Sequence, residues 1–144
     1  MAIRDVISTN LASEFYVASQ LFRQGYTTTI TFGHTKEIDI IVAHPDGRTI
    51  TLDVKGLKNK SNWPISPKLK RKDHFFILVS YLNKFKDISI QPEVFVIPSF
   101  KIDKLLKWWA GKPDVKCIDY RDVKDSKYKD AWHLLFERRI KNAC

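Results

Sequence analysis

Apolar and polar positions alternate along residues 37–56, EIDIIVAHPDGRTITLDVKG. The apolar positions are Ile38, Ile40 and Val42 in the first arm and Ile50, Leu52 and Val54 in the second. Such alternation is typical of strands that bury one face. Between the arms, Pro45-Asp46-Gly47 favours a type I turn followed by a left-handed glycine. The pattern therefore predicts a β-hairpin in which His44 pairs with Arg48.

The turn also fixes which side chains share the polar face of this hairpin. Counting outward gives three further opposed pairs, Ile41–Thr51, Asp39–Asp53 and Glu37–Lys55. A two-residue turn would instead send the two aspartates to opposite faces, because a slip of one residue flips a strand. Directly opposed carboxylates repel each other unless positive charge lies between them. A divalent cation and the Lys55 ammonium are both candidates for that charge.

A helix is expected before the hairpin. Its apolar stripe consists of Leu11, Phe15, Ala18 and Phe22. The N-cap candidates are Ser8, Thr9 and Asn10, and Gly25 is expected to end the helix. Glu14 lies about 60° around the helix from Leu11, beside Leu21, which places its carboxylate at the edge of the core. A carboxylate in that position needs a partner.

The remaining elements follow from shorter apolar runs. We expect strands at 26–32, 74–81, 93–97 and 115–120, and helices at 98–111 and 128–140. The run at 74–81 is apolar throughout, which indicates a central strand covered on both faces, whereas 115–120 is expected at an edge. Trp108 and Trp109 are assigned to helix packing rather than to base stacking. His34 and His74 are interpreted as structural or surface residues.

Length and composition favour one globular domain over residues 1–144, because 44% of the 144 residues are apolar and can form a core. The two cysteines and four histidines show no ligand spacing, which argues against a zinc site or a disulfide framework. We find neither a secretion signal nor an apolar stretch of membrane-spanning length. A cytoplasmic protein without membrane contact is expected.

The positive charge is concentrated in one segment. Residues 55–72 contain seven basic residues and no acid, which leaves only +2 of the net charge of +9 for the rest of the chain. Such a concentration indicates a surface that binds a polyanion. The candidate nucleic-acid contacts are Lys58, Lys60, Trp63, Lys68, Lys70, Arg71 and Lys72, with the tryptophan as a base-stacking residue. A merely solvated loop is the alternative.

These residues together resemble a known nuclease group. A glutamate on the first helix, an aspartate on the second strand and, fourteen positions later, Asp-x-Lys on the third are similar to the PD-(D/E)XK nuclease superfamily. The likeness is greatest to small resolvase-like and restriction-endonuclease-like domains, including archaeal Holliday-junction resolvases. It implies an α/β (α+β) fold with an αβββαβ core, a central mixed β-sheet flanked by helices. The prolines after Lys55 suggest that the usual second helix is reduced to a loop.

The resemblance also implies a function. Glu14, Asp39, Asp53 and Lys55 match the catalytic positions, and Mg²⁺ or Mn²⁺ would be held by Asp39, Asp53, Glu14 and the carbonyl of Val54. Lys55 would orient or deprotonate the attacking water. The implied activity is an Mg²⁺-dependent endodeoxyribonuclease, with branched or structured DNA among its substrates and RNA less favoured. A homodimer is also implied. The alternative is a nucleic-acid-binding module that keeps the fold and does not cleave.

Overall fold

The protein has an α+β fold, seen in a computed structural model that describes residues 3–31, 38–66 and 70–137. The first elements are α1 (Ile3–Arg23), β1 (Thr27–Ile30), β2 (Ile40–Ala43), β3 (Thr49–Leu57), β4 (Asn62–Pro64), β5 (His74–Ser80) and β6 (Glu93–Pro98). The last are the 3-10 helix η1 (Ser99–Lys104), β7 (Lys107–Trp108), β8 (Lys116–Asp119), α2 (Tyr120–Val123) and α3 (His133–Phe136). Within the described ranges, no helix has the length and apolar character needed to cross a bilayer.

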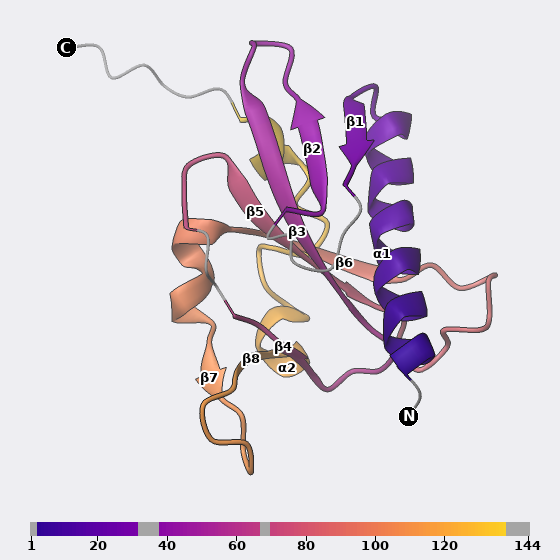
Figure 1. The fold of residues 1–144 in the computed structure, drawn as a ribbon, viewed down its shortest axis with the longest axis vertical. Helices are drawn as coiled ribbons and strands as arrows, with labels where there is room; N and C mark the ends of the chain where they lie inside the picture. Colours follow the sequence, from indigo (N-terminus) through magenta and orange to yellow (C-terminus); the bar gives the residue numbers. More distant parts are fainter. Residues whose placement is uncertain (1–2, 32–37, 67–69, 138–144) are drawn as a thin grey trace.

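A mixed five-stranded sheet in the order β1-β2-β3-β5-β6 organises the fold (Figure 1). The β3–β5 pair is parallel and the other pairs are antiparallel. Every residue of β5 is buried, as expected for a strand covered on both faces. The described residues between β3 and β5 contain the short strand β4 and no helix. This arrangement agrees with a core whose second helix is lost.

The hairpin of β2 and β3 has the predicted register. Its paired residues are Ile40–Leu52, Ile41–Thr51, Val42–Ile50 and Ala43–Thr49. At the turn, the N–H of His44 donates to the carbonyl of Arg48 at 2.9 Å, and the N–H of Gly47 donates to the carbonyl of His44 at 2.9 Å. Gly47 has a φ of 91°, the left-handed conformation that closes this loop. The expected Glu37–Lys55 pair lies outside the described residues.

The first helix packs with a face other than the predicted one. Its buried positions are Thr9, Ser13, Glu14, Val17, Ala18 and Leu21. Leu11, Phe15 and Phe22 are exposed by 38%, 52% and 57%, so the prediction that they pack in the core is wrong. The helix is apolar on two adjacent sides, and the side with smaller residues faces the sheet. Helix α1 begins at Ile3, earlier than predicted, and Gly25 follows it with a φ of 89°.

Gly56 lets α1 lie directly against β3. A Cβ atom at this position would lie 2.3 Å from Ser13 Oγ and 2.8 Å from the carbonyl oxygen of Thr9. Both distances are shorter than side-chain contacts allow, so a larger residue would force the helix away from the strand. The helix is therefore fixed behind β3 at the residue that follows Lys55.

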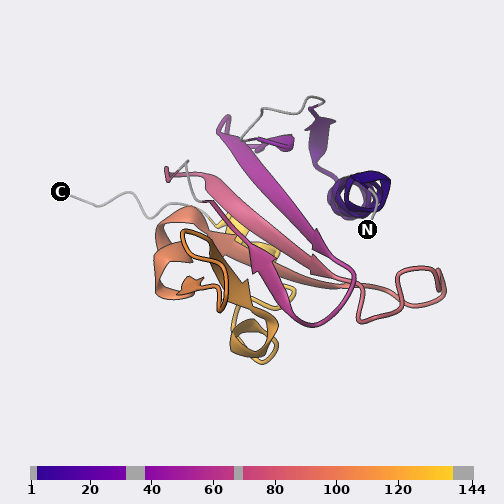
Figure 2. The same ribbon diagram turned by 60° about the horizontal axis from the view of Figure 1, so that its bottom comes forward.

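A second sheet, β4-β8-β7, covers the opposite face of the main sheet from α1. Figure 2 shows α1 end-on at one side of the main sheet, with the later, orange segments at the other. Trp63 of β4 is fully buried between the sheets, where its Nε1–H donates to the carbonyl of Val79 at 3.2 Å. Its ring packs edge-on against Phe95. Part of the segment predicted to be a basic surface loop therefore lies in the core.

Three predicted elements of the C-terminal half are wrong in part. Residues 98–111 form η1 and β7 rather than one helix, because Trp108 pairs with Lys116 and the chain turns back. Trp108 is 66% exposed, so it does not pack a helix. The strand at 115–120 exists, but β8 is the middle strand of the second sheet. Of the helix at 128–140, only α3 is helical up to residue 137; the rest lies outside the described residues.

Candidate active site

Two carboxylates and a lysine meet on the polar face of the β2–β3 hairpin. The acidic pair consists of Asp39 and Asp53, and the Asp39 carboxylate is close enough to act on that of Asp53. Asp39 Oδ2 accepts a hydrogen bond from the N–H of Val54 at 2.7 Å. Lys55 Nζ lies 3.2 Å from Asp53 Oδ1. The structure therefore brings these three side chains together, as the hairpin register predicts.

The surroundings of Asp53 disfavour the charged form of its carboxyl group. Burial, the largest cause, and the neighbouring Asp39 carboxylate together raise the pKa of Asp53 from its ordinary value of 3.8 to about 6, although Lys55 opposes the change. The Asp53 side chain is 13% exposed and that of Lys55 38%. The ammonium of Lys55 is thus the more exposed member of its ion pair with Asp53, and it does not offset the burial of this carboxylate. A further cation would relieve the repulsion that remains.

A second polar group lies next to Asp53 along the same face. The parallel β3–β5 pairing sets Thr51 level with His74. His74 Nδ1 is 2.7 Å from Thr51 Oγ1, and Arg71 Nη2 donates to the same oxygen at 3.3 Å. Burial, with the nearby Arg71 charge, lowers the pKa of His74 to about 4, so this imidazole is neutral near pH 7. Sequence analysis missed this group because it depends on the non-local β3–β5 pairing.

Glu14 is buried at the edge of the core, as its place on the helix predicts. Its neighbours Ser13 and Val17 are buried as well, so this side of α1 faces the sheet. Across the described residues, no group of three or more His, Cys, Asp or Glu side chains is placed to hold a metal ion. Glu14 therefore does not complete a three-carboxylate cluster with the acidic pair, and its assignment as a metal ligand stays a prediction.

The basic run does not form the single patch that its sequence suggests. Lys58 directly follows β3, whereas Arg71 and Lys72 come just before β5, whose first residue is level with Thr51. About seven residues of strand separate these positions, roughly 20 Å at 3.3 Å per residue. The acidic pair lies along this stretch of β3, between two basic ends.

The other predicted nucleic-acid contacts differ in their accessibility. Lys60 is exposed, whereas Lys70 forms an ion pair with Asp103. Lys68 lies outside the described residues. Trp63 is fully buried, so its ring cannot stack on a base, and that prediction is wrong. The error arises because Trp63 belongs to a strand of the second sheet rather than to a surface loop.

The donor set suits a hard divalent cation. Mg²⁺ in proteins is commonly bound by one or two carboxylates, while waters and substrate phosphates complete its octahedral shell. The acidic pair supplies two carboxylates in one place, and the raised pKa of Asp53 indicates that the pair would gain from added positive charge. The carbonyl of Val54 stays a predicted additional ligand.

Comparison with known proteins identifies the fold. No protein-family model matches the sequence, and no curated protein is similar to it in sequence. In structure, the chain is similar to the bacterial homing endonuclease I-Ssp6803I, with a TM-score of 0.50 and 14% sequence identity. The match covers 88% of this chain and 88% of that chain. The fold is the restriction-endonuclease-like fold of PD-(D/E)XK proteins, as the sequence resemblance predicted.

The raised pKa of Asp53 predicts how stability depends on pH without metal. Between its ordinary pKa of 3.8 and its folded value of about 6, the folded state binds more protons at Asp53 than the unfolded state. The free energy of unfolding should therefore fall as pH rises through this window. Asp53→Asn should remove that fall and stabilise the protein at pH 7.

Denaturant unfolding across this pH range in metal-free buffer measures the effect. Asp114→Asn is the matched control, because it makes the same chemical change at an exposed loop residue. It should keep the wild-type pH dependence. Equal pH dependence in wild type and Asp53→Asn would contradict the assignment of the raised pKa to Asp53.

Proposed function

We propose that this chain, which has the restriction-endonuclease-like fold, is an Mg²⁺-dependent endodeoxyribonuclease that also accepts Mn²⁺. The acidic pair beside Lys55 supports the proposal most directly. A structural ion pair would need only one carboxylate for one lysine. The second carboxylate, Asp39, helps to raise the pKa of Asp53, and carboxyl groups perturbed in this way cluster at functional sites.

The side chains of this face have separable roles in phosphodiester hydrolysis. A divalent ion at the acidic pair would supply positive charge against the phosphate and acidify a bound water. Lys55 is accessible enough to contact a phosphate oxygen or the attacking water. The hydrogen bond from Val54 holds the Asp39 carboxylate in place before substrate arrives, which favours preorganisation. Glu14 is proposed as a further acidic residue of the activity on the strength of the resemblance to the nuclease superfamily.

The two basic ends of β3 support a path for DNA. Lys58 lies beyond one end of the strand, and Arg71 and Lys72 lie by the other. A backbone that contacts both ends passes the acidic pair between them. Phosphate contacts of this kind position a nucleic acid without reading its sequence. The preference for DNA over RNA rests on the resemblance to the nuclease superfamily.

The exposed side of α1 supports the proposed homodimer. Between Val6 and Phe22 the only charged residue is Glu14, and it is buried, so this side presents no charge. Two copies of a chain with net charge +9 repel each other, and they can approach most easily through a neutral surface. The exposed apolar residues Leu11, Phe15 and Phe22 recur at spacings of four and seven residues, which places them on one side of the helix. We propose that a second copy docks here about a twofold axis.

Cleavage tests the proposed activity. Purified protein should nick supercoiled DNA with Mg²⁺ or Mn²⁺, and EDTA should stop it. Lys55→Ala should lower the rate by about 10²–10⁴-fold, the range for loss of a positioned acid–base group, with little change in DNA affinity. Lys124→Ala, an exposed lysine beside α2, is the control. If supercoiled, linear and branched DNA and single-stranded RNA all remain intact with the wild type, a non-catalytic binding module replaces this proposal.

Salt dependence tests the two basic ends. Replacing both Lys58 and Lys72 with Gln should flatten the slope of log affinity against log salt on duplex DNA by about 2 units, since each neutralised phosphate contributes about 0.9. Fluorescence anisotropy in EDTA gives the slope. The control changes Lys124 and Lys127 to Gln, with the same loss of charge, and should leave the slope unchanged. Equal flattening in both double variants would contradict the proposed path.

Light scattering coupled to size-exclusion chromatography tests the homodimer. Phe15→Lys places charge in the centre of the exposed apolar side of α1 and should convert a dimer into a monomer. Ile88→Lys adds the same charge at a loop residue that is 99% exposed and should leave the dimer intact. A wild-type protein that is monomeric at micromolar concentration would contradict this proposal.

A further inference from the structure

An arm formed by β7, β8 and their connecting loop, residues 107–119, projects from the body of the protein (Figure 1). Its edge strand carries Trp108, which is 66% exposed. Between Lys107 and Lys116 the arm contains three lysines and one aspartate. An exposed tryptophan on a projecting cationic strand is an unusual surface, because tryptophan is normally highly buried. The proposed active site does not use this surface.

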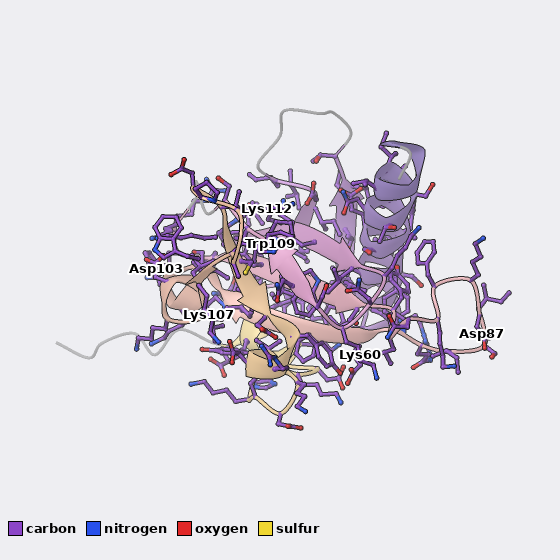
Figure 3. All side chains as sticks on the ribbon, turned by 90° about the horizontal axis from the view of Figure 1, so that it is seen from below. Lys60, Asp87, Asp103, Lys107, Trp109 and Lys112 are labelled. Carbon is purple, nitrogen blue, oxygen red and sulfur yellow. The ribbon has the colours of Figure 1, made fainter. Side chains whose placement is uncertain are left out.

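Each tryptophan of the arm has an ammonium group over its ring. Lys112 Nζ lies 4.4 Å from the centroid of Trp109, and Lys116 Nζ lies 4.9 Å from that of Trp108. Figure 3 shows Lys112 and Trp109 side by side on this segment. Such contacts are worth only about 0.5–1 kcal/mol at exposed sites, so a ligand can displace the lysine from the ring. The arm therefore offers aromatic faces with positive charge within one side-chain length.

The tip of the arm carries a shallow, open groove of about 490 Å³. It is lined by Trp108, Trp109, Gly111, Lys112, Pro113 and Asp114. The N–H of Trp109 donates to the carbonyl of Val115 at 2.8 Å, and that of Lys112 donates to Trp109 at 3.1 Å. Gly111 adopts a left-handed φ of 79°, which favours glycine. These bonds hold the groove in a defined shape.

The arm lies on the same side of the main sheet as the acidic pair. Phe76 and Leu78 of β5 are level with Asp53 and Lys55. Both pack in the core between the two sheets, where Ile118 of the arm also packs. The arm is therefore attached on the side of the main sheet toward which Asp53 and Lys55 project.

We propose that the arm binds single-stranded DNA by stacking a base on Trp108, with Lys112 and Lys116 contacting the adjacent phosphates. Every base has a π-face that can stack on an aromatic ring, and phosphates supply the matching negative charge. A duplex hides the faces of its bases, so the arm selects DNA with unpaired bases. If the proposed nuclease function holds, DNA with unpaired bases is also the preferred substrate. The binding of single-stranded DNA by the arm does not depend on that function.

Binding measured without cleavage tests the arm. In EDTA, Trp108→Ala should weaken the affinity for a labelled oligothymidylate by roughly 5- to 150-fold, the range for loss of one stacked base. The salt slope should not change, because no charge is lost. Trp108→Phe keeps an aromatic face and should recover most of the affinity. Replacing Lys112 and Lys116 with Gln should instead flatten the slope on single-stranded DNA by about 1.4 units.

Ile88→Ala, at an exposed apolar residue outside the arm, is the matched control and should bind as the wild type does. The stacking proposal is overturned if Trp108→Ala loses no more affinity than this control, or loses as much for a duplex as for the single strand. Melting curves check that the variants are folded, and Trp108→Phe allows the test even if the alanine variant unfolds. Normal single-strand binding without any cleavage would overturn the nuclease function and leave the arm standing.

Discussion

At the end of the hairpin, the carboxylate of Asp39 serves as the hydrogen-bond acceptor that a backbone carbonyl would otherwise supply to β3. Strand β2 begins only at Ile40, and the N–H of Val54 is paired with the Asp39 side chain. A buried N–H without a partner would cost about 1–3 kcal/mol, so this carboxylate maintains the pairing of β3 as well as providing charge. The same bond holds the carboxylate beside Asp53, whose pKa rises to about 6. Structural support and electrostatic repulsion thus arise from one side chain.

Strand β3 combines three requirements along nine residues. Its polar face carries Asp53 and Lys55, its parallel neighbour β5 supplies the Thr51–His74 contact, and Gly56 admits α1 from behind. The polar face requires charged residues at Asp53 and Lys55, and the opposite face requires a glycine at Gly56. The helix therefore cannot shift without moving the strand that bears the two charged side chains.

Local chemistry explains which features could be predicted from the sequence. The hairpin register follows from a turn whose residues are adjacent in the chain, and the depth of Glu14 follows from helical periodicity. The packing face of α1 could not be predicted, because the helix is apolar on two adjacent sides and only the sheet selects one. The sequence predicts Trp63 at the surface and Trp108 in the packing of a helix, but Trp63 is buried and Trp108 is exposed. Both positions depend on the second sheet, which forms from segments far apart in the sequence.

Strand β4 has its partner late in the chain, since Asn62 pairs with Asp119. Contacts so distant in sequence form slowly, because a long loop must close first. During synthesis the hairpin with Asp39 and Asp53 can fold as soon as it leaves the ribosome, but Trp63 has no complete pocket until Tyr120 has followed. The segment that joins β3 to β5 is therefore anchored through β4 only after residues 117–120 have been made.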